Sequence, residues 1–236
     1  MLSATAFVLL LGQSSKNIDS YVPTNFKGAS FTTKKVSANQ AELAKINKDF
    51  GMSYRFDSMA VKIKEPHKLR LEGKVGDSTF LFIMNGTKKI VKAARAGISI
   101  SDDVAKEPGK RQTVFDFGLL TPALLDDYFD AKFVREDRTT KDVVFDLFYK
   151  KFTSDETRHR VWIDPAKKVI TKREWYSQNG EKRLLATFVY SGFVTEGGVS
   201  FPTEYKVMNA AGKVAGSLKY SNLDLNPTLA DSLFTK

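Results

Sequence analysis

Alternating apolar and polar positions predict that most of this chain folds into antiparallel strands joined by tight turns. In VWIDPAKKVITKREWY, residues 161–176, two runs rich in β-branched and aromatic residues flank Asp164-Pro165. Asn179-Gly180 follows the second run, and Asn85-Gly86 separates residues 80–84 from residues 87–92. Asn-Gly adopts the positive φ angles of a type I′ turn, whose twist suits antiparallel neighbours. The chain is therefore predicted to be built at least partly from consecutive hairpins.

The same strand pattern extends over most of the remaining chain. The connections between these strands are too short to join anything but antiparallel neighbours. About eleven strands are expected, with a further candidate at 29–36 and a polar, irregular stretch at 99–112. The eleven cover residues 52–64, 68–75, 79–84, 87–93, 133–137, 143–152, 157–163, 169–176, 184–191, 199–208 and 213–225.

Only two helices are predicted. Ser37 and Gln40 fit a capping box that starts the first helix, and Gly51 is placed to end it. Thr121 can cap the second helix, with Pro122 at its first position. The first helix carries an apolar stripe of Leu43, Ile46 and Phe50, and one side of the second is formed by Leu120, Ala123, Leu124, Asp127 and Tyr128.

These elements predict one α+β domain, because no internal repeat and no long linker interrupts them. Several strands, such as residues 143–149 and 184–190, have one face that is bulky and apolar. A single antiparallel sheet of this length must curl, and its concave face must be covered. The two helices then either plug a core or form a lid over a pocket.

Charge and cysteine content limit the classes of partner and chemistry, but they do not identify one partner. The net charge is +10, from 37 Lys and Arg against 27 Asp and Glu. That charge favours anionic partners such as phospholipid head groups or nucleic acid, but scattered Lys and Arg also fit an ordinary solvated surface. The absence of cysteine excludes thiolate catalysis, disulfides, Cys-based zinc sites and lipidation at a lipobox cysteine.

The first fifteen residues are predicted to be an export signal. Residues 4–11 are apolar and too short to span a bilayer, and small polar residues follow at 12–15. No Lys or Arg precedes the apolar run, which departs from the signal pattern. The alternative is a cytosolic protein whose first strand is buried.

Catalytic and metal-binding patterns are weak. His67 and His159 have no paired-His spacing and are predicted to be surface residues, and no G-x-S-x-G motif occurs. The adjacent carboxylates at 102–103 and 126–127 point apart and form no acid/base pair. Basic and aromatic residues interleave, but no RNP-type motif supports nucleic-acid binding. We expect no enzyme activity, no cofactor, no metal and no nucleic-acid partner.

Seven segments follow one another in a characteristic order: KIKEPHKLRLE, FLFIMNGTKKIVKA, FGLLTPALLDDYF, VFDLFYKK, VWIDPAKKVITKREWYSQNGEK, GGVSFPTEYKVMNAAGK and NLDLNPTLADSLF. Together they resemble the LolA-like superfamily of outer-membrane lipoprotein-sorting proteins, over roughly residues 30–236. The resemblance implies a half-open antiparallel barrel of eleven strands, with helices across its concave apolar face. It also implies proteins that carry lipoprotein acyl chains through the periplasm, or that bind lipid and partner proteins in envelope sensing, without enzymatic chemistry.

The expected function is therefore a monomeric periplasmic carrier, with residues 16–236 as a domain that binds a lipid or lipoprotein acyl chain. An inner-membrane donor or an outer-membrane acceptor protein would be its partner. The alternative is a periplasmic sensor or scaffold domain that binds a partner protein.

The apolar residues expected at the ligand are divided between a lid and a wall, and plain core packing is the alternative role for each of them. The lid comprises Leu119, Leu120, Leu124, Leu125, Tyr128 and Phe129, and the wall comprises Phe80, Phe82, Val143, Phe145, Leu147, Phe188 and Tyr190. One polar residue is added from the resemblance. The lipoprotein carriers place an Arg directly before a Pro, whereas here Glu65 precedes Pro66, and Arg70 matches the P-x-x-x-R form of the wider superfamily.

Overall fold

The computed structural model describes residues 16–47, 50–153, 155–178 and 182–235. The predicted signal at 1–15 and the Asn179-Gly180 turn lie outside these residues. About half of the described chain forms one antiparallel sheet of thirteen strands, in the order β6-β5-β4-β3-β2-β1-β15-β14-β11-β10-β9-β8-β7. The predicted α+β fold with a single curved antiparallel sheet is confirmed, with thirteen strands in place of about eleven.

The strands of the large sheet are β1 (Gly28–Ala38), β2 (Ser58–Lys64), β3 (Lys68–Val75), β4 (Ser78–Asn85), β5 (Lys88–Ala93), β6 (Ile98–Asp103), β7 (Phe129–Glu136), β8 (Val143–Tyr149), β9 (Arg158–Asp164), β10 (Val169–Tyr176), β11 (Leu184–Ser191), β14 (Glu204–Asn209) and β15 (Val214–Leu225). A separate pair is formed by β12 (Val194–Glu196) and β13 (Val199–Phe201). The helices are α1 (Gln40–Ile46) and α2 (Pro122–Asp127), with 3-10 turns η1 (Ile18–Tyr21), η2 (Phe50–Arg55), η3 (Ala94–Ala96), η4 (Pro108–Lys110), η5 (Val114–Phe117) and η6 (Asp231–Phe234).

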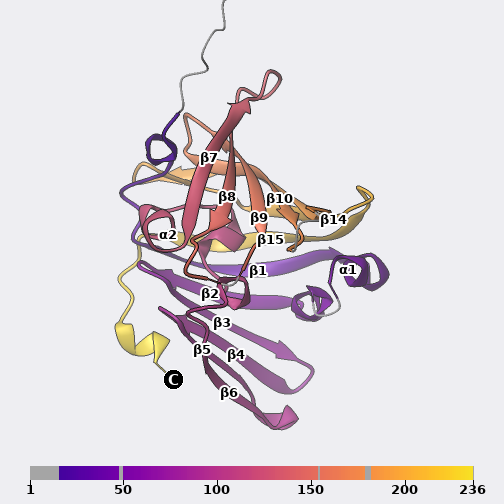
Figure 1. The fold of residues 1–236 in the computed structure, drawn as a ribbon. Helices are drawn as coiled ribbons and strands as arrows, with labels where there is room; N and C mark the ends of the chain where they lie inside the picture. Colours follow the sequence, from indigo (N-terminus) through magenta and orange to yellow (C-terminus); the bar gives the residue numbers. More distant parts are fainter. Residues whose placement is uncertain (1–15, 48–49, 154, 179–181, 236) are drawn as a thin grey trace, which may run out of the picture.

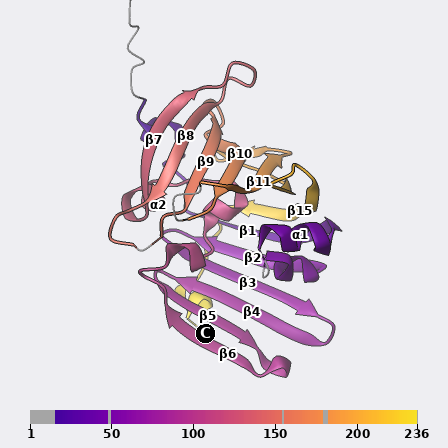
Figure 2. The same ribbon diagram turned by 45° about the vertical axis from the view of Figure 1, so that its right-hand side comes forward.

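The sheet is strongly bent and stays open at β6 and β7. Figures 1 and 2 show β7, β8 and β9 crossing the direction of β1 to β6 at a steep angle, with α2 beside the start of β7. Strand β1 pairs with β15, so segments from both ends of the chain meet in the middle of the sheet. A single large apolar core on the concave face includes residues of α1, α2, η5 and most strands.

The start of the first helix was predicted wrongly. Asn39, and not Ser37, is its N-cap, and the Asn39 side chain accepts a hydrogen bond from the Glu42 amide at 3.2 Å. Ser37 stays in β1, where its hydroxyl lies 2.7 Å from that of Ser217. Because β1 continues its pairing with β15 as far as Ala38, the helix can begin only after that residue. Its predicted end was wrong too, since residues 50–55 form η2.

Several strand predictions also needed correction. The strand predicted at 52–64 starts only at Ser58, because residues 50–55 form η2, and the strand predicted at 133–137 starts at Phe129. The stretch predicted as irregular contains β6, an edge strand whose residues are all exposed. Its acidic residues pair with lysines of β5, and Lys89 Nζ lies 3.2 Å from Asp102 Oδ2. The strand predicted at 199–208 is divided by Pro202, because proline has no N–H to donate to a ladder.

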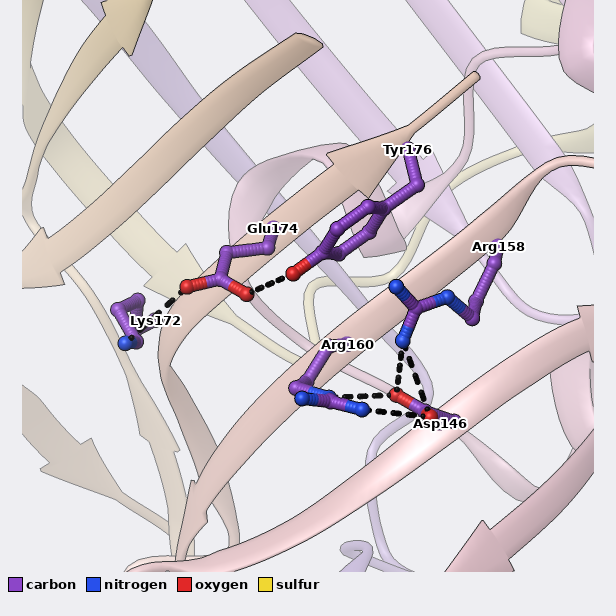
Figure 3. Close-up of polar contacts among 6 residues, drawn as sticks. All are labelled: Asp146, Arg158, Arg160, Lys172, Glu174 and Tyr176. Carbon is purple, nitrogen blue, oxygen red and sulfur yellow. Dashed lines mark hydrogen bonds and ion pairs between the residues drawn. The ribbon is translucent and has the colours of Figure 1, made fainter. Parts of the chain in front are cut away.

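The face of β8, β9 and β10 that points away from the core carries a polar network (Figure 3). Asp146 accepts hydrogen bonds from Arg158 at 3.1 Å and from Arg160 at 2.7 and 2.9 Å. Glu174 accepts from the Tyr176 hydroxyl at 2.6 Å and from Lys172. The period of two along a strand places these residues opposite the apolar side chains of the same strands. The network therefore keeps the outer surface of the sheet solvated.

We expect Asp146→Asn to lower the free energy of unfolding at pH 7 by about 1 to 2 kcal/mol, because Arg158 and Arg160 lose their shared carboxylate. Burial raises the pKa of the Asp146 carboxyl, but the hydrogen bonds and charges of Arg160 and Arg158 outweigh it and hold that pKa below 3.8. The stability that ionised Asp146 adds to the folded state is thus present above pH 3.8 and is lost as the pH falls through the folded-state pKa. Urea unfolding of wild type and Asp146→Asn at pH 7 measures the loss of stability, and an unchanged midpoint would contradict the prediction.

Candidate functional site

A cavity of about 470 Å³ lies on the concave side of β8 to β11, between α2 and the loop that contains η4 and η5. Its volume is within the range of small-molecule sites. The large apolar side chains of its lining come from η2, η5, α2 and four strands of the sheet or the residues beside them. They are Phe50, Phe115, Leu124, Tyr128, Phe129, Tyr149, Trp175 and Phe188. This wall can hold a hydrocarbon chain by excluding water from it.

The structure brings four of the thirteen predicted ligand residues to this cavity, namely Leu124, Tyr128, Phe129 and Phe188. Seven others are buried in the core around it: Leu119, Leu120, Leu125, Val143, Phe145, Leu147 and Tyr190. Phe82 is half-buried against the same core, and the Phe80 ring lies 5.1 Å from the Phe56 ring. A role of any of the thirteen in ligand binding remains a prediction.

The predicted lid helix, α2, is attached at both ends to the turn between β2 and β3. The Thr121 hydroxyl, at the N-cap, donates to Glu65 Oε2 at 3.0 Å and accepts from the Leu124 amide at 3.4 Å. At the other end, Asp127 Oδ2 lies 2.6 Å from His67 Nε2. These two contacts add to the packing of Leu124 and Leu125, which are buried in the main core.

Glu65 is the unusual member of these contacts. Burial raises the pKa of its carboxyl to about 7, and the hydrogen bond from Thr121 only partly opposes that effect. A carboxyl in this state carries a proton about half the time at neutral pH. The charge beneath the N-terminus of α2 consequently depends on pH within the physiological range.

No protein-family model and no curated protein sequence matches the chain. Solved structures do match. The LolA superfamily protein NE2245 from Nitrosomonas europaea covers 93% of this chain and 94% of its own, at 17% identity and a TM-score of 0.61. A "putative outer membrane lipoprotein-sorting protein domain" from Vibrio parahaemolyticus covers 92% and 93%, at 12% identity and a TM-score of 0.62. This chain has the LolA fold. The resemblance seen in the sequence is thereby confirmed at the level of the fold.

A third match is a DUF1329 family protein from Desulfovibrio piger, which covers 92% of both chains at 13% identity and a TM-score of 0.55. Each of these three structures covers 92 to 93% of this chain, so the shared fold extends over nearly all of it. On this fold, the cavity occupies the concave face that the sequence predicted to be covered by helices.

Arg70 lies on the other face of the LolA-fold sheet. Its Nη1 donates to the Leu233 carbonyl at 2.7 Å, and its Nε donates to Glu72 at 2.8 Å. Phe234, from the same C-terminal segment, is fully buried against Ile83 and Ile90 in a second, smaller core. The observed contacts of Arg70 thus hold the C-terminal segment, and its predicted functional role remains a prediction.

His159 was wrongly predicted to lie at the surface. It is 6% exposed, and its ring packs against Phe115, Phe129 and Tyr149 inside the cavity. Burial lowers the pKa of His159 well below its ordinary value, and the nearby charge of Arg173 lowers it further. The imidazole is therefore neutral. His67 is not a surface residue either, because its side chain is 9% exposed and its ring lies 4.5 Å from that of Tyr128.

Sequence reasoning missed the cations of the cavity, Arg111 and Arg173, which are 8% and 4% exposed. Arg173 could have been predicted from the alternation along β10. Its neighbours Lys172 and Glu174 lie on the outer face, so the side chain between them belongs to the inner face. Arg111 lies in a loop with no periodicity and had no such signal.

Within the described residues, no three His, Asp or Glu side chains gather as metal ligands. None of the helices formed by those residues is long and apolar enough to cross a membrane.

Proposed function

We propose that this protein binds an acyl chain of a lipid or lipoprotein in the periplasm and carries it, without covalent chemistry. The observation that carries the proposal is the cavity beside α2, in which large apolar side chains lie next to polar and charged ones, on the concave face of a LolA fold. Eight large apolar side chains line it, and α2 packs Leu124 and Leu125 into the core and contacts the β2–β3 turn through Thr121 and Asp127.

The energetics agree with reversible carriage. Each methylene moved from water into an apolar site gains about 0.8 kcal/mol, so six to eight buried methylenes supply about 5 to 6 kcal/mol. That corresponds to a dissociation constant of about 0.1 mM before any contact of the head group, and the ligand can still be released. A monomer of residues 16–236 is sufficient for this task, with an inner-membrane donor or an outer-membrane acceptor as its partner.

A second candidate, a sensor or scaffold that binds a partner protein, is favoured by the edge strand β6. Ile98 and Ile100 are 40% and 43% exposed on this strand. An edge with free backbone groups can pair with an extended segment of another chain. On this account the lipid cavity would act as a regulatory input.

Transfer of a fluorescent acyl lipid between vesicles tests the carrier proposal. Donor and acceptor vesicles are separated, and the purified protein is added in catalytic amounts. We expect a transfer rate proportional to protein concentration. Binding of the lipid without any transfer would favour the sensor role, and absence of both would refute the proposed function.

A further inference from the structure

Arg111 is a buried cation whose hydrogen bonds are incomplete. Its Nη2 donates to the carbonyls of Val104 and Ala105 at 3.2 and 3.0 Å, and its guanidinium lies 4.1 Å from the centre of the Tyr128 ring. Its Nε and Nη1 have no hydrogen-bond partner among the described residues, and no carboxylate of that part of the chain forms an ion pair with it. A guanidinium stays charged at every physiological pH, so burial without an anion is costly.

A second arginine in the same cavity has a free donor. Arg173 Nη1 donates to Asp116 Oδ1 at 3.2 Å, and the guanidinium is stacked between Phe115 and Phe188, at 4.5 and 4.2 Å from their ring centres. Its Nε is buried and has no partner within the described residues. Nδ1 of the neutral His159 is likewise buried without one. Three side chains that line one cavity therefore hold unused nitrogen atoms.

The carboxylates of the cavity already have donors of their own. Glu107 lies 2.7 Å from Lys110 Nζ at the exposed rim. Asp116 accepts from Arg173 and from the Thr113 amide. Asp155 accepts from the Gly109 and Thr157 amides and from Gln178. Arg111 is thus the cation of this lining that lacks a counter-charge.

We infer that the ligand is an acyl lipid with an anionic head group, a carboxylate or a phosphate, whose oxygens bind Arg111 and the free Nε of Arg173. The apolar wall would hold the chain, and the two guanidinium groups would hold the head. Planar N–H donors match the oxygens of both anions. This inference rests on the proposed function and specifies the chemical class of its ligand.

The test compares palmitate with methyl palmitate, which has the same chain and no charge, on the wild-type protein by displacement of a fluorescent acyl probe. We expect palmitate to bind at least tenfold more tightly. Arg111→Met should weaken palmitate binding about tenfold and leave methyl palmitate within twofold of wild type. Lys106→Met is the matched control, because it removes the same charge from an exposed position on the same loop. It should change neither affinity by more than twofold.

Each contrary outcome has its own meaning. Equal affinity of the wild-type protein for palmitate and methyl palmitate would overturn the inference while leaving the proposed function intact. Binding of neither lipid would refute the proposed function itself. Binding of inorganic phosphate alone, measured by calorimetry, with no binding of palmitate, would show a site for small anions and also overturn the inference. If Arg111→Met fails to fold, the wild-type comparison still tests whether the ligand has an anionic head group.

Discussion

Glu65→Gln is expected to stabilise the protein at pH 8 by about 3 kcal/mol. The pKa of the Glu65 carboxyl rises from 4.5 to about 7 on folding because the group is buried. The folded state therefore holds the proton more tightly than the unfolded state does. The stability from this group is fully present below pH 4.5 and is lost as the pH rises through about 7. Glutamine resembles the protonated side chain, and its carbonyl can still accept from Thr121.

Urea unfolding of wild type and variant at pH 5 and pH 8 measures this effect. The wild-type protein should lose stability between the two values, whereas the Glu65→Gln variant should change much less. Glu196→Gln, at an exposed position of β12, is the control and should behave like wild type. If Glu65→Gln were less stable than wild type at pH 8, the buried, half-protonated carboxyl would be the wrong description.

Gln112→Trp is expected to weaken acyl-chain binding about a hundredfold. Gln112 is half-buried and lines the cavity, so a tryptophan there would occupy space that the chain needs. Exclusion of about four methylenes costs about 3 kcal/mol, which is about two powers of ten in affinity. The loop position can accept the larger side chain without disturbing a strand, so the melting temperature should stay within a few degrees of wild type.

Displacement of a fluorescent acyl probe measures the affinity of this variant, and thermal unfolding measures its stability. Lys92→Trp is the control, because it introduces a tryptophan at an exposed position of β5, a strand that contributes no residue to the cavity lining. It should bind the probe as wild type does. Undiminished binding by Gln112→Trp would show that acyl chains bind somewhere other than this cavity.

Local chemistry explains which elements could be predicted from the sequence. The Asn85-Gly86 hairpin and the Thr121-Pro122 start of α2 depend on residues close in sequence, and both are observed. The start of α1 depends on β1 pairing with β15, which lies about 180 residues away, and it was predicted wrongly. Strand β6 has no buried face, so it had no hydrophobic alternation to detect.

The lining of the cavity could be predicted from the sequence only in part. Large apolar side chains such as Leu124 and Phe188 could be predicted to lie inside, because burial is their usual state. Arg111, Arg173 and His159 are exceptions to that rule, and their burial follows from packing between a loop and two strands. Composition and periodicity predict whether a residue type is usually buried or exposed. The proposed head-group site depends on polar residues that are buried against that rule.

Native mass spectrometry of the protein purified from an exporting bacterial host, followed by organic extraction, tests the central claim most directly. The account predicts one acyl-bearing molecule per chain in the wild-type protein and an empty Gln112→Trp variant from the same host. A wild-type protein that is empty, and that stays empty when offered fatty acids and phospholipids, would contradict it.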